Sequence, residues 1–268
     1  MQFKKILVGI DFSEITETVI NSAVYLADIF NAEIKLVHIV ENTLFPVPLD
    51  DIEPFIDPEE FKKIVKKVEE ITQISAEKLK EISQKINNER GIKTSFSVVT
   101  GDIAEELLEI GEQGNFDLIV IGAHKNTSSE TFLLGNEAEK IVNKARFSVL
   151  VVKGKPVKKI EKLLVGYDFL PNSIEAVETA KEIAKKIKAE IDIVHADTEE
   201  GFAHFSHIYE TVFQKKVELL KQLIENLKKE GIKADFEIIK TSPDRAITEA
   251  IKDFDSDLVV VGKDRERI

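Results

Sequence analysis

Apolar and polar residues follow one another in blocks that predict strands and helices in turn. Residues 5–10 form a continuous apolar run, which is typical of a parallel strand buried on both faces. After Ser13, apolar residues recur every three or four positions as far as Phe30, which predicts an amphipathic helix opened by Ser13. Another strand is expected at 33–39. The chain therefore starts as strand, helix and strand.

The pattern continues with a strong helix start. Asp57-Pro58-Glu59-Glu60 combines a capping aspartate, a proline at the first helical position and a glutamate at the capping-box spacing. A long amphipathic helix is expected to follow, and then a strand at 95–99, a helix at 102–113, a strand at 117–121, a helix near 137–145 and a strand at 147–152. Alternating strands and helices predict an α/β fold, a Rossmann-like open parallel sheet with right-handed crossovers.

The pattern occurs twice. Residues 5–12 (KILVGIDF) match 162–169 (KLLVGYDF), and 91–122 match 231–262, each without a gap. Only the first copy has an insertion, at 44–56, which we expect to pack on its own long helix or to form a lid or partner surface. The second copy lacks a counterpart of the last helix and strand. We therefore expect a complete domain at 1–153, a linker at 154–160 and a C-terminally shortened domain at 161–268.

Charge and composition narrow the range of functions. With 49 acidic against 37 basic residues, the formal charge is −12, which argues against general nucleic-acid binding. The absence of cysteine excludes disulfides, thiolate metal sites and cysteine nucleophiles. No apolar run approaches the roughly 20 residues of a membrane-spanning helix. We expect a cytoplasmic protein with neither a membrane nor a nucleic-acid partner.

Candidate chemistry lies at the carboxyl ends of the predicted strands. In an open parallel sheet, ligands bind where the strand order reverses. If the first strand lies beside the fourth, Asp11 and Gly122 come together at that crevice. The loop 123–129, together with Gly135-Asn136 at a helix start, supplies glycines, hydroxyls, a lysine and a helix N-terminus, which are the parts of an anion cradle. An ordinary loop with Asn136 as the helix N-cap explains the same residues.

Several segments together resemble the universal stress protein family. They are KKILVGIDFSE, AEIKLVHIVE, GDIAEELLEI, DLIVIG and LLGNEAEKIVNKARFSVLVVK. The resemblance covers residues 1–153 almost fully and 159–262 in the second copy, and the doubled unit is similar to the tandem members of the family. It implies a stress-response protein made of two domains with the fold of the adenine nucleotide alpha hydrolases.

The resemblance also implies a nucleotide site. Family members that hold ATP carry glycine, two residues, glycine, nine residues, glycine, and then serine or threonine. Gly122 and Gly135 match the first and third glycines, whereas Lys125 stands at the second glycine and Asn136 at the hydroxyl position. Lysine adopts a left-handed conformation at a cost that glycine avoids, and Glu137 and Glu139 add negative charge near the phosphate position. We expect weak or modified binding of ATP or AMP in the first copy only, with magnesium present only as the nucleotide's companion.

Two further positions resemble family contacts. Asp11 matches the aspartate at the end of the first strand, and Ile39 falls where an apolar residue contacts adenine. Asp168 repeats Asp11 in a copy without a phosphate loop, so Asp11 is also expected to cap the first helix or order the turn. Gly9 and Gly166 are interpreted as room for packing within a strand.

Other polar residues favour plainer interpretations. His204, His207 and Glu210 have a spacing that could place three metal ligands on one helical face, but a solvated helix start is the favoured interpretation. His38 and His195 end equivalent strands and are expected to form hydrogen bonds at the edge of the core. Neither a P-loop, a G-x-G-x-x-G sequence nor a G-x-S-x-G elbow is present, which disfavours the matching enzymes.

The strand at 147–152 is long enough to be an unpaired edge. The resemblance implies that this strand pairs with its twin across a dimer, so we expect a homodimer unless the short copy is covered differently. Three functions remain: a nucleotide-binding stress protein, a nucleotide-free dimerising interaction or regulatory module with an unknown protein partner, and a slow ATP hydrolase. Asp11 is the one group we identify that could activate water. We assign no catalytic residue and expect a protein that is not an enzyme.

Overall fold

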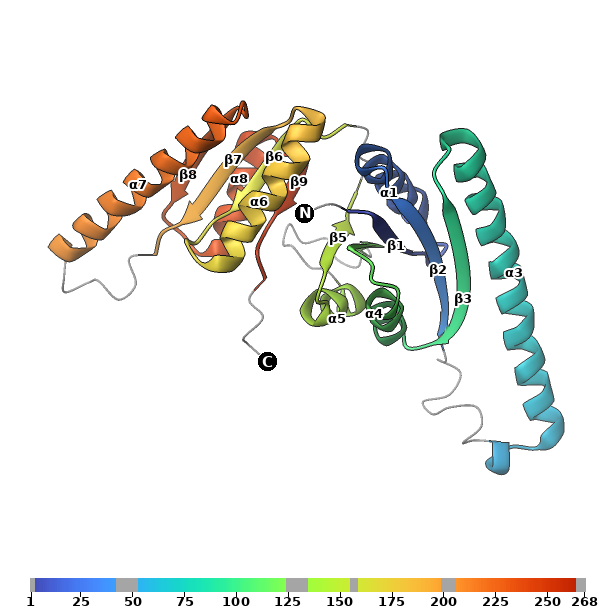
Figure 1. Cartoon of the computed structure of the whole chain (residues 1–268). Coiled ribbons are helices and arrows are strands. Elements are labelled where there is room, and N and C mark those ends of the chain that lie inside the picture. The colour runs from blue at the N-terminus through green and yellow to red at the C-terminus, as the bar shows by residue number, and fades with distance from the viewer. Residues whose placement is uncertain (1–2, 42–52, 124–134, 155–158, 199–205, 264–268) are drawn as a thin grey trace. The chain divides into compact units, whose positions relative to one another are not determined.

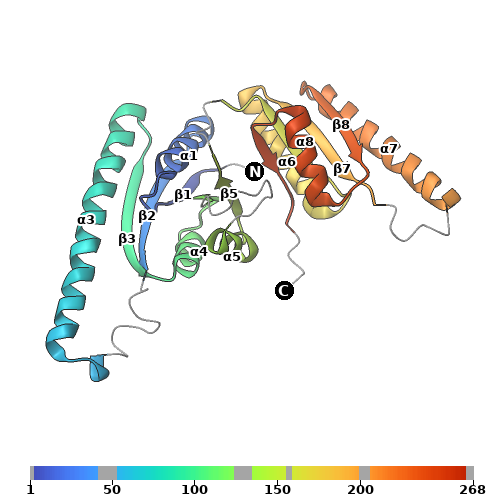
Figure 2. The same cartoon turned by 180° about the vertical axis from the view of Figure 1, so that it is seen from behind.

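The computed structural model describes residues 3–41, 53–123, 135–154, 159–198 and 206–263. Contacts within the chain divide it into two compact units, Gln2–Lys158 and Lys159–Ile268, which we call the first and second units (Figures 1 and 2). Each unit is built on one parallel sheet flanked by helices, as the alternating sequence pattern predicts.

The first unit holds a five-stranded sheet in the order β3-β2-β1-β4-β5. Its strands are β1 (Lys5–Gly9), β2 (Glu33–Glu41), β3 (Thr94–Gly101), β4 (Leu118–Gly122) and β5 (Ser148–Val152). Every neighbouring pair is parallel. The first strand does lie beside the fourth, so the strand order reverses between β1 and β4 as expected.

Helices cover both faces of this sheet. Helices α1 (Thr16–Phe30) and α3 (Pro58–Arg90) lie on one face, and α4 (Ile103–Gln113) and α5 (Asn136–Lys144) lie together on the other (Figures 1 and 2). A short 3-10 turn, η1 (Glu53–Phe55), precedes α3. Asp57 caps α3 as predicted, because its Oδ1 accepts a hydrogen bond from the amide of Glu59 at 2.9 Å.

The expectation that Ser13 opens the first helix is wrong. The helix begins at Thr16, and no side chain caps it. Phe12 has a φ of 56°, and the amide of Ser13 donates to Asp11 Oδ1 at 2.9 Å. Residues 11–15 therefore form a turn ordered by the aspartate, and the helix N-cap is Ile15 in place of Ser13.

The second unit repeats this arrangement with four strands in its described part. Strands β6 (Lys162–Gly166), β7 (Glu190–Ala196), β8 (Ala234–Ile239) and β9 (Leu258–Val260) lie in the order β8-β7-β6-β9. Its helices are α6 (Pro171–Ile187), α7 (Ser206–Lys229) and α8 (Pro243–Phe254). Two open parallel sheets are thus confirmed, and the second is the smaller one within the residues described.

The two strand glycines make room for packing, as interpreted. A Cβ atom at Gly9 would lie 3.1 Å from side-chain carbons of both Leu107 and Ile121. At Gly166 it would lie 3.1 Å from Cγ1 of Val261. The same close approach therefore occurs at the end of the central strand in both units.

A second duplicated feature fastens the other end of the central strand. Asp117 Oδ2 accepts hydrogen bonds from the amides of Lys4 and Lys5 at 2.7 and 2.9 Å. Asp257 Oδ2 does the same for Glu161 and Lys162 at 2.8 and 3.0 Å. One carboxylate thus pairs two strand-entry amides that the sheet leaves without partners.

Candidate functional site

The candidate crevice lies at the carboxyl edge of β1 and β4. Val8 pairs with Val120, so the two strands end at nearly the same level. Gly122 ends β4 against the start of α1, where an added Cβ would lie 2.9 Å from Cγ2 of Ile15. Asp11 bonds to the same helix start, because Thr16 Oγ1 donates to its Oδ1 at 2.9 Å. The turn after β1 and the end of β4 thus meet at the N-terminus of α1.

Asp11 orders its turn, and its counterpart in the second unit does so too. Asp168 Oδ1 accepts a hydrogen bond from the amide of Leu170 at 2.9 Å, as Asp11 does from Ser13. The residue after each aspartate is left-handed, with φ of 56° at Phe12 and 67° at Phe169. This confirms the expected structural role of Asp11, while its contact with a nucleotide stays a prediction.

Among the described residues, no side chain caps the N-terminus of helix α5. Gly135 occupies the N-cap position with φ of 82°, and no atom of the described residues lies within 4 Å of a Cβ built on it. Asn136 is the first helical residue, so the alternative that made it the N-cap is wrong; glycine takes that place because the backbone there is left-handed. Uncapped amides at the start of a helix attract anions.

The acidic first turn of α5 is partly neutralised. Glu137 Oε1 accepts a hydrogen bond from Lys140 Nζ at 2.7 Å. This bond raises the pKa of Lys140 above its ordinary value and keeps the lysine charged. Glu139 is exposed. The negative charge expected to oppose phosphate is therefore reduced at Glu137.

Of two further residues predicted to contact a nucleotide, the structure describes Ile39 but not Lys125. Ile39 is 7% exposed and belongs to a buried cluster beneath α4 and α5, together with Leu107 and Ile141. Its side chain is thus mostly committed to the core, and the adenine contact stays a prediction. Lys125 lies in the segment 124–134, outside the described residues, as does most of the predicted insertion.

At the corresponding place in the second unit, the chain after β9 packs closely against the backbone at the start of α6. A Cβ atom at Gly262 would lie 2.3 Å from the carbonyl carbon and oxygen of Asn172. Helix α6 there begins with Pro171, which has no amide hydrogen to offer an anion. In the first unit, a Cβ at Gly122 would meet the side chains of Ile15 and Val19 among the described residues. The two copies therefore differ at the place where the sheet topology puts a ligand.

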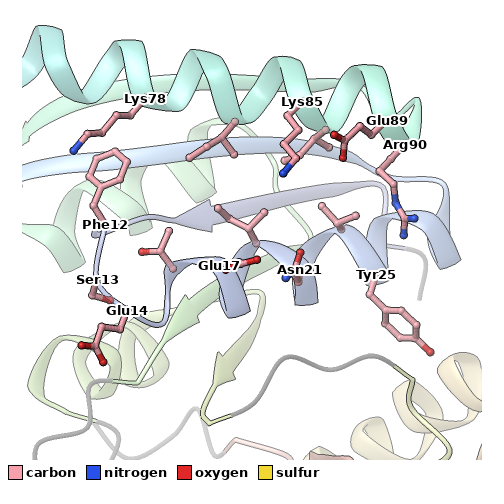
Figure 3. A pocket seen from close by; sticks show the side chains of 15 residues that line it. Phe12, Ser13, Glu14, Glu17, Asn21, Tyr25, Lys78, Lys85, Glu89 and Arg90 are labelled. Atoms are coloured by element: carbon pink, nitrogen blue, oxygen red, sulfur yellow. The ribbon is translucent and has the colours of Figure 1, made fainter.

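A separate groove of about 880 Å³ lies between α1 and α3 of the first unit (Figure 3). Lys78 and Lys85 project from α3 on one side, and Glu17 lies on α1 on the other (Figure 3). Lys78 Nζ lies 5.1 Å from the centre of the Phe12 ring. The groove thus reaches the turn after β1 but runs along the helices, away from the start of α5.

The histidines that end equivalent strands form the hydrogen bonds expected of them. His38 Nδ1 lies 2.7 Å from the carbonyl oxygen of Ile10, and His195 Nδ1 lies 2.8 Å from that of Tyr167. His204 lies outside the described residues. Among the residues that are described, no group of three or more histidine, aspartate or glutamate side chains could hold a metal ion.

Comparison with known proteins decides the family. A sequence model of the universal stress protein family matches residues 2–153 and, a second time, residues 159–267. The chain belongs to the universal stress protein family. Because the family matches twice, this universal stress protein is a tandem member.

Named relatives agree with this assignment. The chain is 31% identical over 160 residues to Universal stress protein MJ0531 of Methanocaldococcus jannaschii, covering 59% of this chain and 85% of the relative. It is 28% identical over 159 residues to Universal stress protein A homolog 1 of Coxiella burnetii, covering 57% of this chain and 97% of that relative. A crystal structure of a universal stress protein from Archaeoglobus fulgidus superposes with a TM-score of 0.75 at 22% identity, covering 100% of this chain and 88% of that one, which shows the shared fold.

No helix in the described part of the chain is both long and apolar enough to cross a membrane. The expected cytoplasmic location stays a prediction.

Proposed function

We propose that the first unit of this universal stress protein binds an adenine nucleotide, ATP or AMP, at the carboxyl edge of β1 and β4. The observation that carries the proposal is the start of α5, where Gly135 has a positive φ and no described side chain caps the helix or lies within 4 Å of a Cβ built on Gly135. Amides of that first turn would hold phosphate, because a helix N-terminus carries partial positive charge. Magnesium would accompany the phosphates.

The remaining predicted residues complete this site. Gly122 and the turn ordered by Asp11 would border the nucleotide, Ile39 would contact the adenine, and Lys125 and Asn136 would supply a charge and an amide donor. Lysine and asparagine replace the glycine and the hydroxyl that the family's ATP-holding pattern has, so we propose weaker or modified binding. The close backbone packing at Gly262, which differs from the side-chain contacts of Gly122, supports a site in the first unit.

We propose a binding protein rather than an enzyme. The Asp11 carboxylate is the one candidate base, and its Oδ1 accepts hydrogen bonds from Ser13 and Thr16. These bonds commit Oδ1 to ordering the turn. The alternative, a nucleotide-free interaction or regulatory module, is favoured by the groove between α1 and α3 with its charged walls.

Calorimetric titration of the full chain with ATP and with AMP tests the proposal. We expect saturable uptake by the millimolar range, and a loss of about fivefold in affinity in Gly135→Ala, because alanine disfavours the left-handed backbone by about 1 kcal/mol and shifts the amides. Gly154→Ala is the matched control, since Gly154 has φ of 84° and equally open surroundings. No uptake at millimolar nucleotide would remove the proposal and favour the interaction module.

We also propose a homodimer in which β5 pairs with its twin from a second chain. Within the described residues β5 is an edge strand that is bonded only to β4. Exposed edges of this kind invite another strand. Sedimentation is expected to give the mass of a dimer, with slow amide exchange at 148–152; a monomer in which this strand exchanges rapidly contradicts the proposal.

A further inference from the structure

Helix α7 of the second unit is held to its sheet by two different kinds of contact. Its apolar anchors are Leu220, Ile224 and Leu227, all at most 5% exposed. Before them, Val212 and Leu219 are 37% and 40% exposed, and none of the side chains described in residues 208–219 is buried. The first half of α7 (206–219) therefore depends on polar and aromatic contacts.

Asp197 supplies the main polar contact. It follows β7 directly and is 1% exposed. Lys216 Nζ donates to its Oδ1 at 2.6 Å, and the Tyr209 hydroxyl donates to its Oδ2. Burial would raise the pKa of Asp197, but the hydrogen bonds from Lys216 and Tyr209 outweigh it and hold this pKa below its usual value. The carboxylate thus stays charged and fastens the first half of α7 at two points.

His195 lies beside this carboxylate with one nitrogen unsatisfied. Its Nδ1 faces the carbonyl oxygen of Tyr167, which can only accept, so Nδ1 carries the hydrogen and Nε2 keeps a lone pair. Nε2 is buried, has no hydrogen-bond partner among the described residues and lies 4.0 Å from Asp197 Oδ1. A proton on Nε2 would therefore face the same oxygen that Lys216 holds.

We propose that His195 is an acid-operated switch: when Nε2 gains a proton it takes Asp197 Oδ1 from Lys216 and loosens the first half of α7. Lys216 gives up the carboxylate to His195 because the two side chains differ in their exposure to water. The Lys216 side chain is 28% exposed and can carry its charge into water, whereas His195 is 7% exposed and must find its partner inside. A buried unpaired imidazolium would be costly, so the carboxylate is claimed by the histidine.

The groups around His195 also favour the loosened state at low pH. Burial lowers the pKa of His195, and Lys216 on α7 lowers it further, while the Tyr167 carbonyl, Asp197 and Asp168 raise it. The fastened state thus disfavours the proton, and departure of Lys216 removes part of that penalty. By linkage, falling pH favours the loosened state. The fastening is complete above the ordinary histidine value of 6.5 and is lost as pH falls below it.

Two groups near the switch, Lys240 and Tyr209, are not displaced when His195 gains a proton. Lys240 Nζ lies 5.5 Å from the ring centre of Tyr209 and 5.7 Å from that of Phe213. The hydrogen bond to Asp197 raises the pKa of Tyr209, so the phenol stays protonated across the acid range. Loosening is therefore partial, and the apolar anchors from Leu220 onward stay in place.

The first unit provides an internal control. His38 has the same bond from Nδ1 to a backbone carbonyl, that of Ile10. Val40 stands where the second unit has Asp197, so the sequence there offers no equivalent carboxylate. A fall in pH is accordingly expected to leave α3 unchanged.

Hydrogen exchange of the full chain, corrected for the intrinsic effect of pH, tests the switch. We expect exchange in residues 206–219 to quicken about tenfold from pH 7.5 to pH 5, because falling pH favours the loosened state. Residues 220–229 should not change. His195→Asn keeps a donor for the Tyr167 carbonyl and should abolish the step, whereas His38→Asn should leave it intact.

A second variant guards against misfolding of the first. Lys216→Met removes, at a partly exposed position, the ammonium group that holds Asp197. This variant should give fast exchange in residues 206–219 at both pH values. Exchange in 206–219 that ignores pH, or a step that survives in His195→Asn, would overturn the proposal. A nitrogen nuclear magnetic resonance spectrum that places the ring hydrogen of His195 on Nε2 at pH 7.5 would overturn the proposal as well.

Discussion

Replacing Gly262 by alanine is expected to destabilise the second unit by about 3 kcal/mol, because the new methyl group would meet backbone that cannot easily move. The added Cβ would lie 2.3 Å from the Asn172 carbonyl and 2.8 Å from the amide nitrogen of Ser173. Urea unfolding, followed by hydrogen exchange in β6 and β7, measures the loss in that unit.

The equivalent change in the first unit is the matched control. At Gly122 the new methyl would approach Cγ2 of Ile15 at 2.9 Å and Cγ2 of Val19 at 3.2 Å. Side-chain tips can turn aside, so Gly122→Ala should cost only about 1 kcal/mol. Equal losses in the two variants would contradict the conclusion that Gly262 packs against backbone where Gly122 packs against side chains.

Replacing Leu107 by alanine is expected to destabilise the first unit by about 3 kcal/mol and to weaken nucleotide binding with it. Leu107 is buried on α4 in the cluster that also contains Ala138 and Ile141 of α5. A cavity there loosens the helix whose N-terminus would hold phosphate. Thermal unfolding and calorimetric titration below the unfolding temperature measure the two effects.

Leu164→Ala separates stability from binding. Leu164 is fully buried in the core of the second unit, among Val194, Ala246 and Ala250. We expect a similar loss of stability in that unit and unchanged nucleotide affinity in the first. If Leu164→Ala weakened binding as much as Leu107→Ala, binding would not be confined to the first unit.

The fold could be predicted from the sequence because its signals are local and occur twice. Buried parallel strands show as apolar runs, and Asp57-Pro58 marks the start of α3 correctly. The start of α1 was missed because Asp11 uses its carboxylate on the turn, an effect of side-chain geometry that hydrophobic spacing does not reveal. Asn136 was misplaced for a similar reason, since the backbone angle at Gly135 decides where α5 begins.

Contacts between distant segments were harder to predict. The hydrogen bonds that Asp117 and Asp257 accept at the start of each central strand join residues more than ninety positions apart. An aspartate at the same position of both copies was the signal that could have found them. Asp197 was missed because its partners lie on another element. Its signal is a difference between the copies, a carboxylate where the first copy has Val40.

Comparison of the two copies also separates structure from function. The aspartate turn and the strand glycines are present in both units, so their presence supports the fold and says little about a ligand. The start of α5 belongs to the first unit, and the fastening of α7 at Asp197 belongs to the second.

Amide shift mapping by nuclear magnetic resonance, with ATP added to the full chain, tests one nucleotide site in the first unit most directly. We expect saturable shifts confined to the turn 11–16, the end of β4 at Gly122 and the first turn of α5 from Gly135. Shifts around Asp168 and Gly262 of matching size, or no shift at millimolar ATP, would contradict this account.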